Sequence, residues 1–280
     1  MSIDLVSEHG CFGGVQRFYK HASRETRGIM KFSVYLPPQS RSAKVPVLYF
    51  LSGLTCTEET FAIKSHAQQV AAQLGLMLVA PDTSPREPRL PGDADSWDFG
   101  QGAGFYVDAT ETPWAAHYRM YSYVTRELPQ VVAANLPAST ERQGIFGHSM
   151  GGHGALICAL RNPAQYRSVS AFAPIAAPTQ APWGQKAFRN YLGTDVAAWR
   201  EYDASVLVAA QRFPTKILID QGEADQYLAE QLLPGKFAAA AAKSGQTLEL
   251  RMQPGYDHGY YFIQSFMADH LRHHAAHLTA

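Results

Sequence analysis

The sequence predicts an α/β protein with a mainly parallel central sheet flanked by helices on both faces. The continuous apolar run VPVLYFL (45–51) is typical of a strand buried on both faces, and LMLVAPD (76–82) predicts the next buried strand. Segments with helical periodicity alternate with such runs, and this alternation favours parallel strands joined by helices. The chain has 280 residues, of which 46% are hydrophobic and 17% charged, as expected of a well-packed globular protein.

In the first half of the chain, the alternating segments FYKHAS and MKFSVYLP predict two short strands. The two buried strands follow, separated by a helical pattern over 58–75 that stops at Gly75. A polar, Gly- and Pro-rich segment from 83 to about 112 is longer than ordinary connections in compact domains, so we expect it to line a functional site.

The second half continues the alternation. Helices are predicted over 118–136 (kinked or broken at Pro129), 150–162, 229–245 and 260–278, and strands in QGIFGHS, SVSAFAPIA, TKILIDQG and TLELRMQPG. We expect residues 1–280 to form one domain in which 177–210 is a helical or loop excursion, forming a small cap. On the last helix His270 and His274 are four residues apart, a metal-binding spacing, but we expect a solvated face there.

Composition excludes several classes of function. The 24 basic and 24 acidic side chains balance, so neither nucleic acid nor an anionic membrane is expected as a partner. The first residues carry acids and no apolar core, which is unlike a signal peptide, and no apolar stretch approaches the roughly 18 residues of a membrane span. Cys11, Cys56 and Cys158 are scattered and odd in number, which favours reduced thiols in a cytoplasmic protein.

The stretch GHSMG (147–151) places Ser149 between a predicted strand and a predicted helix. This is the G-x-S-x-G motif in its required context, a tight turn that exposes a nucleophilic serine. Small residues are needed two positions before and after the serine because side chains there would collide. A plain strand-to-helix turn is the alternative interpretation.

A serine nucleophile needs a base and an orienting acid, each placed after a later strand. His258 follows the strand TLELRMQ, whereas His148 and His153 flank Ser149 too closely to act as its base, so we interpret them as packing or hydrogen-bonding groups. For the acid we favour Asp225, in the loop beyond TKILIDQG, with Asp220 as the second candidate.

Several stretches together resemble the S-formylglutathione hydrolase (esterase D) family. They are LSGLTCTEE, DTSPR, DADSWDFGQGAGFYVDAT, GHSMGGHGAL, DQGEADQYL and GYDHGYYF, and the resemblance spans about residues 5–275. It implies the α/β-hydrolase fold and hydrolysis of S-formylglutathione to glutathione and formate in formaldehyde removal, with activity on short carboxylic esters.

The resemblance also implies roles for particular residues. Ser149, Asp225 and His258 would be the catalytic triad, and the backbone N–H groups of Leu54 and Met150 would form the oxyanion hole. It implies a cytoplasmic enzyme that needs no cofactor or metal and often forms a homodimer. Which cations bind the glutathione carboxylates stays open, with Lys64 and Arg86 as candidates.

The sequence departs from the family's usual pattern in two places. Gly259 stands where the family usually has serine after the histidine, which we expect to loosen that turn. The stretch after DTSPR also differs, which we expect to reshape the mouth of the site.

Alternatives remain for single residues and for the whole chain. Cys56 is either a redox-sensitive thiol near the site or a buried small hydrophobe. Trp97, Phe105 and Tyr106 either wall the cavity or belong to the core. The rival functions are a general short-chain carboxylesterase or acyltransferase on the same scaffold, and a catalytically dead binding protein with this fold.

Overall fold

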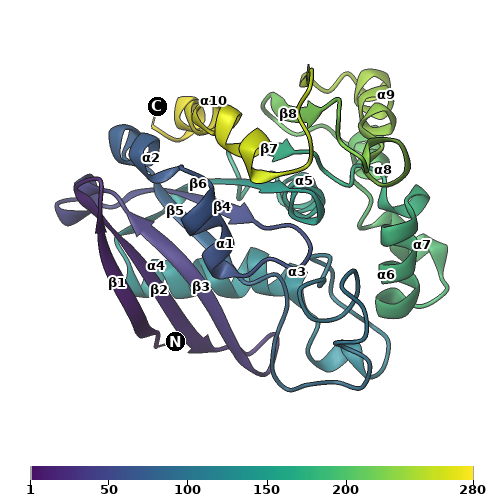
Figure 1. Cartoon of the computed structure of the whole chain (residues 1–280), viewed down its shortest axis with the longest axis horizontal. Helices are drawn as coiled ribbons and strands as arrows, with labels where there is room; N and C mark the ends of the chain where they lie inside the picture. The colour runs from purple at the N-terminus through teal and green to yellow at the C-terminus, as the bar shows by residue number, and fades with distance from the viewer. Residues whose placement is uncertain (1, 280) are drawn as a thin grey trace.

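A nine-stranded sheet forms the centre of the computed structural model, which describes residues 2–279. In chain order its strands are β1 (Asp4–Cys11), β2 (Gly14–Ala22), β3 (Ile29–Leu36), β4 (Val45–Leu51), β5 (Met77–Pro81), β6 (Ala138–His148), β7 (Ser168–Phe172), β8 (Ile217–Gly222) and β9 (Leu248–Gln253). Across the sheet the order is β1-β2-β3-β5-β4-β6-β7-β8-β9. Strands β4 to β9 are parallel, and β1 to β3 form an antiparallel edge at the left of Figure 1. The predicted mainly parallel sheet is confirmed.

Helices cover both faces of this sheet. They are α1 (Glu58–Lys64), α2 (Gln68–Leu74), α3 (Met120–Ser122), α4 (Leu128–Asn135), α5 (Met150–Arg161), α6 (Pro182–Leu192), α7 (Val196–Arg200), α8 (Ala204–Ala210), α9 (Pro234–Ser244) and α10 (Tyr260–Leu278). Helix α10 packs on β6, β7, β8 and α2, whereas α5 packs on the other side of β4, β6 and β7 (Figure 1). Strand β4 is buried along its whole length, as its apolar sequence predicts.

The edge strand β1 was not predicted, and its sequence explains why. DLVSEHGC carries no alternation of apolar and polar residues, and most of its side chains are exposed. A strand that pairs on one side only and packs on little needs no apolar face. Its pairing with β2, rather than its own pattern, makes it a strand.

The single helix expected over 58–75 is wrong, because the structure divides it into α1 and α2. His66 between them has a φ of 56°, in the left-handed region, which ends the first helix. The stop at Gly75 is confirmed, since this residue caps α2 with a φ of 69°.

The two prolines inside predicted helices, Pro129 and Pro234, lie at helix beginnings. Pro129 is in the first turn of α4, directly after a π-helical turn at Tyr123–Glu127, so the predicted break is a change of helical winding. Pro234 begins α9, after a second π-helical turn at Leu228–Leu232. A proline lacks an N–H, and the first turn of a helix has no use for one.

The 177–210 excursion between β7 and β8 is helical. It contains a 3-10 turn (Pro178–Gln180) followed by α6, α7 and α8, and α6 and α7 lie at the right of Figure 1. None of the helices described for residues 2–279 combines the length and apolar character that crossing a bilayer requires.

Candidate active site

Ser149 lies at the turn from β6 into α5, with backbone angles that a serine rarely adopts. Its φ is 58° and its ψ −119°, and its N–H donates to the Phe172 carbonyl at 3.0 Å. The Ser149 carbonyl in turn accepts from the N–H groups of His153 and Ile175. Packing and hydrogen bonds therefore hold a strained backbone, as expected where a side chain must be presented for chemistry.

The flanking glycines are required sterically. A Cβ on Gly151 would lie 1.9 Å from the Leu51 carbonyl oxygen, and a Cβ on Gly147 would lie 2.2 Å from the Gly151 oxygen. The turn is therefore so tight that β4, β6 and α5 meet at backbone distance. The steric reason predicted for the two glycines is confirmed.

His258 and Asp225 form a hydrogen-bonded pair. Nδ1 of His258 lies 2.6 Å from Oδ2 of Asp225, whose side chain is fully buried. Asp225 also accepts from the N–H of Tyr227 at 2.8 Å and from Gln221 at 3.3 Å. An ionised carboxylate accepts only, so the Nδ1 proton faces Asp225 and Nε2 is left with its lone pair.

Asp220, the second candidate acid, belongs to a different cluster. Its carboxylate accepts from Arg251 Nε at 2.8 Å and from His270 Nε2 at 2.9 Å, and these bonds lower the pKa of Asp220 to about 2 although burial opposes them. His270 in turn contacts Ser170 at 2.8 Å, so Ser170, His270 and Asp220 mimic a triad. All three are fully buried, so no substrate can reach them.

The solvated face expected for His270 and His274 is therefore wrong. Both imidazoles are buried between α10 and the sheet, where Ser168 and Ser170 are hydrogen-bonded to His274 at 2.7 and 2.8 Å. In the part of the chain that the structure describes, no group of three or more His, Cys, Asp or Glu is placed to hold a metal ion.

The loop after β4 passes directly beside Ser149. A Cβ on Gly53 would lie 3.2 Å from the Ser149 Cβ, and the next residue, Leu54, lines the same cavity as Ser149. The Thr55 N–H donates to the Gly102 carbonyl at 2.9 Å, so the long polar segment predicted to line the site supports this loop. Met150 is the first residue of α5, and N–H groups in a first helical turn have no intrahelical acceptor.

A cavity of about 210 Å³ brings most of the predicted site residues together. Its lining residues are Gly53, Leu54, Thr55, Cys56, Trp97, His148, Ser149, Trp183, Tyr227, His258 and Tyr260. Asp225 and Met150 stand behind this wall, both buried. Of the three aromatic candidates, Trp97 lines the cavity, and Phe105 and Tyr106 belong to the core.

Trp183, Tyr227 and Tyr260 form an aromatic wall of the cavity that the sequence did not predict. The Trp183 ring lies edge-on to Trp97, with centroids 5.4 Å apart, and contacts Tyr227 at 4.7 Å. Tyr227 continues to His258 at 5.1 Å. Tyr227 and Tyr260 are each two residues from a predicted site residue, which is the one signal that the sequence offers.

Cys56 lines the cavity, but its surroundings do not activate the thiol. Burial raises its pKa, against weaker opposing effects of Thr60 and the Lys64 charge. A thiol with a raised pKa holds little thiolate at neutral pH and is correspondingly slow to oxidise. The redox role of Cys56 stays a prediction, and this environment favours the alternative of a buried hydrophobe.

Arg86 and Lys64, the two candidates for binding the glutathione carboxylates, differ in whether their charge is already paired. Arg86 is bound to Asp82 and to the Cys56 carbonyl, whereas the ammonium of Lys64 lies 5.9 Å from the ring centroid of Tyr260.

Gly259 is the residue before α10 and has a φ of −86°, a conformation open to any residue. Its N–H donates to the Asp257 carboxylate at 2.8 Å. The Asp257 carboxylate thus holds the residue before the helix, and no side chain of the described residues caps the first turn of α10.

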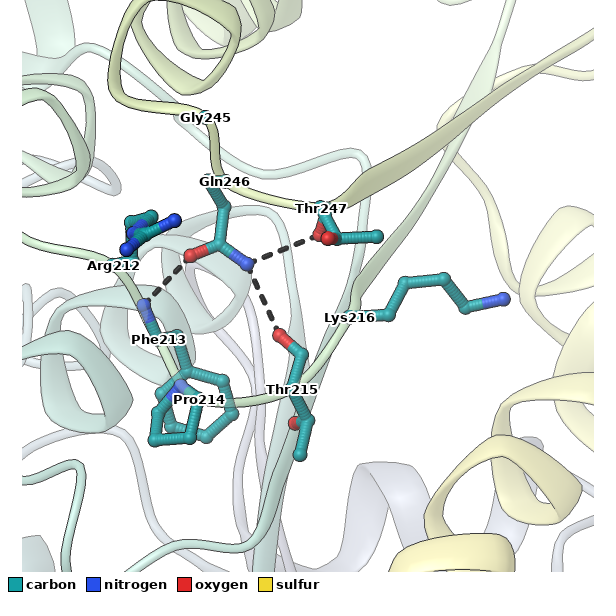
Figure 2. A pocket seen from close by; sticks show the side chains of 8 residues that line it. All are labelled: Arg212, Phe213, Pro214, Thr215, Lys216, Gly245, Gln246 and Thr247. Atoms are coloured by element: carbon teal, nitrogen blue, oxygen red, sulfur yellow. Dashed lines mark hydrogen bonds between the residues drawn. The ribbon is translucent and has the colours of Figure 1, made fainter.

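A larger cavity of about 620 Å³ lies at the amino ends of β8 and β9, where its lining residues lead into these strands (Figure 2). Gln246 holds its walls together by accepting from the Phe213 N–H and donating to the carbonyls of Thr215 and Thr247. None of the eight described residues that line it is a Ser, Cys, His, Asp or Glu. Size therefore does not identify the reactive site, whereas the convergence of polar groups at the carboxyl ends of the parallel strands does.

Comparisons with known proteins agree with this geometry. The esterase family described as "Putative esterase" matches residues 23–273. The chain is 57% identical over 282 residues to S-formylglutathione hydrolase of Rattus norvegicus, covering 100% of both chains, and 53% identical over 278 residues to that of Paracoccus denitrificans (strain Pd 1222), covering 99% of each. The solved structure of an S-formylglutathione hydrolase from Agrobacterium tumefaciens is similar with a TM-score of 0.96 at 49% identity, covering 98% of this chain and 99% of that one.

A parallel sheet with helices on both faces and a serine on a strand-to-helix turn define an esterase of the α/β-hydrolase class. Within that class, full-length identities above 50% leave the family in no doubt. The chain belongs to the S-formylglutathione hydrolase family.

Proposed function

We propose that this protein hydrolyses the thioester S-formylglutathione to glutathione and formate, with side activity on short-chain esters. The observation that carries the proposal is the full-length identity to S-formylglutathione hydrolases, together with the hydrogen bond between His258 and Asp225 beside Ser149. The metabolic role of this reaction would be formaldehyde removal.

The first half of the proposed reaction forms an acyl-enzyme. Ser149 Oγ attacks the formyl carbon while His258 Nε2 takes its proton, and Asp225 stabilises the imidazolium. The backbone N–H groups of Leu54 and Met150 stabilise the oxyanion. Collapse of the tetrahedral intermediate breaks the C–S bond, and the imidazolium returns the proton to the leaving sulfur, which releases glutathione.

The second half removes the formyl group. A water molecule attacks the formyl-Ser149 ester while His258 again takes a proton, and collapse returns that proton to Ser149 Oγ and releases formic acid, which ionises to formate. Because the leaving thiolate is stable, one acid–base group and an oxyanion site suffice, and we propose that no cofactor or metal takes part.

The dimensions of the site support a small acyl group and a larger leaving group. The cavity at Ser149 measures about 210 Å³, less than the ~300 Å³ at which pockets for drug-sized ligands begin. A second hollow of about 320 Å³, lined by Ala224, Gln226, Asp257, His258 and Gly259, shares His258 with this cavity. Two hollows that share His258 suit an enzyme whose imidazole transfers a proton to the departing group.

We further propose a cytoplasmic enzyme of one domain, spanning 1–280, that forms a homodimer. All nine strands belong to one continuous sheet, which supports a single domain. Trp183 of α6 lines the cavity, which supports a capping role for 177–210. The unpaired outer edge of β1, with Leu5 and Val6 exposed, offers a surface for a second copy.

The test is hydrolysis of S-formylglutathione and of p-nitrophenyl acetate by the wild-type protein and by Ser149→Ala. We expect kcat/KM to favour the thioester, and we expect the variant to lose roughly 10⁴-fold or more on both substrates. Ester turnover without thioester turnover would instead support the general carboxylesterase. Activity persisting in Ser149→Ala would refute the nucleophile, and a wild-type protein inactive on both substrates would support the binding-protein alternative.

A further inference from the structure

His148 stands directly before Ser149, and its side chain contacts the two other parts of the proposed catalytic machinery. Its ring centroid lies 4.5 Å from that of His258, with the ring planes inclined by 45°. Its Nδ1 lies 3.3 Å from the point where a Cβ on Gly53 would stand, in the loop that carries Leu54. One side chain therefore borders the nucleophile, the base and the oxyanion loop.

The imidazole of His148 is buried beside His258, and no hydrogen bond of good geometry accounts for its presence there. The residue is 6% exposed, and neither ring nitrogen has a hydrogen-bond partner within residues 2–279. Burial holds the pKa of His148 well below its usual value, and the charge of His258 lowers it further, whereas a contact with the His258 backbone acts in the opposite direction. His148 therefore meets His258 mainly through its tilted ring, with a weaker polar contact to the His258 backbone.

The His258 imidazole needs a packing contact to fix the plane of its ring. A single hydrogen bond to Asp225 fixes the Nδ1 edge of the imidazole but leaves its plane free to tilt, and 17% of the side chain is open to solvent. Tyr227 packs edge-on against the ring at 5.1 Å, with planes at 83°, and His148 lies against it at 4.5 Å. Together these two rings restrict the plane of the imidazole.

We propose that His148 is a positioning residue, whose neutral ring holds His258 with Nδ1 toward Asp225 and Nε2 toward Ser149. This inference rests on the roles proposed above for Ser149, Asp225 and His258. A group that orients the base, without touching substrate, affects the transition state more than substrate binding. Its loss therefore lowers kcat and leaves KM nearly unchanged.

The experiment compares four variants on S-formylglutathione and p-nitrophenyl acetate, each measured well below its own Tm. His148→Ala and His148→Leu remove the flat ring, and we expect kcat to fall about 10- to 100-fold on both substrates with KM within about 3-fold of wild type. His148→Phe restores a ring, and we expect it to recover kcat to within about 5-fold of wild type.

His153→Ala is the matched control, because His153 is also a buried histidine close to the serine in sequence. Its Nε2 bonds the Phe105 carbonyl at 2.9 Å, and it does not line the cavity. We expect this variant to lower Tm while kcat stays within about 2-fold.

Three outcomes would overturn the proposal: wild-type kcat in His148→Ala or His148→Leu, a defect in KM alone, or a loss in His148→Phe as large as in His148→Ala. If His148→Ala does not fold, the Leu and Phe variants decide by the same criteria. A wild-type protein inactive on both substrates would be a failure of the proposed function, which is a separate result.

Discussion

Asp225 and Asp220 are two carboxylates at the carboxyl end of β8, and their neighbours give them different work. Asp225 orients His258 at the cavity, whereas Asp220 is fully buried against Arg251 and His270. In the sequence both lie near the end of one strand, and Asp225 is favoured only because it lies in the loop, from which its carboxylate can turn back toward His258. The direction in which each side chain points decides between them.

Asparagine at each position separates the two roles. We expect Asp225→Asn to lower kcat/KM roughly 10³- to 10⁴-fold with little change in Tm, because an amide no longer fixes the Nδ1 tautomer. We expect Asp220→Asn to lower stability by about 3 kcal/mol, because it breaks a buried ion pair, while kcat stays near wild type. The measurements are steady-state kinetics and denaturant unfolding. Loss of activity in the folded Asp220→Asn protein together with an active Asp225→Asn would reverse the assignment.

At the scale of an element, α10 is attached to the sheet by a directional chain of hydrogen bonds. Asp220 accepts the His270 Nε2 proton, so His270 Nδ1 accepts from Ser170. Ser170 then accepts from His274 Nε2, and His274 Nδ1 accepts from Ser168. In this series of hydrogen bonds both imidazoles are neutral and each ring nitrogen has a partner. Burial also favours the neutral form, because it lowers the pKa of His270 and of His274.

Removing the central hydroxyl tests this attachment. Ser170→Ala leaves a nitrogen of each histidine without its partner, so we expect a loss of about 1–3 kcal/mol in the free energy of unfolding, with kcat unchanged. Ser265→Ala is the control, since Ser265 is exposed on the same helix and its hydroxyl bonds the Tyr261 carbonyl one turn before it. The measurement is urea unfolding of both variants, and equal stability of the two would show that the chain contributes nothing.

At the scale of the whole molecule, buried neutral histidines make the fold sensitive to acid. Burial lowers the pKa of His21, His148, His153, His270, His273 and His274, to about 4 for His153 and His273. A histidine whose folded pKa lies below the unfolded value of about 6.5 binds its proton preferentially in the unfolded state. Its stabilising contribution is complete above pH 6.5 and is lost as the pH falls below that value.

We therefore expect Tm to be nearly constant between pH 7 and 8 and to fall as the pH drops from 6.5 toward 4. A loss of about 2 kcal/mol corresponds to roughly 4–8 °C in a chain of this size. Asp220 adds to the loss below pH 4, since its lowered pKa stabilises the fold only while it is ionised. Calorimetry across this range is the measurement, and a Tm that stays constant down to pH 5 would contradict the prediction.

Local patterns in the sequence determined the strand-and-helix alternation, the turn at Ser149 and the candidates His258 and Asp225. They did so because each depends on short-range physics: the apolar run of a buried strand, the small residues of a tight turn, and the chain order of acid and base after successive strands. Where local preference was weak, as in β1, or was overridden by a positive φ at His66, prediction failed.

Only the tertiary structure decided which polar groups face the cavity and which are sealed in the core. Ser170, His270 and Asp220 have the same chemistry as an active site, yet they lie between α10 and the sheet, where no substrate enters. The ring contact of His148 with His258 likewise joins residues 110 positions apart. Burial and contact between distant segments depend on how the layers pack, and no local pattern in the sequence records that packing.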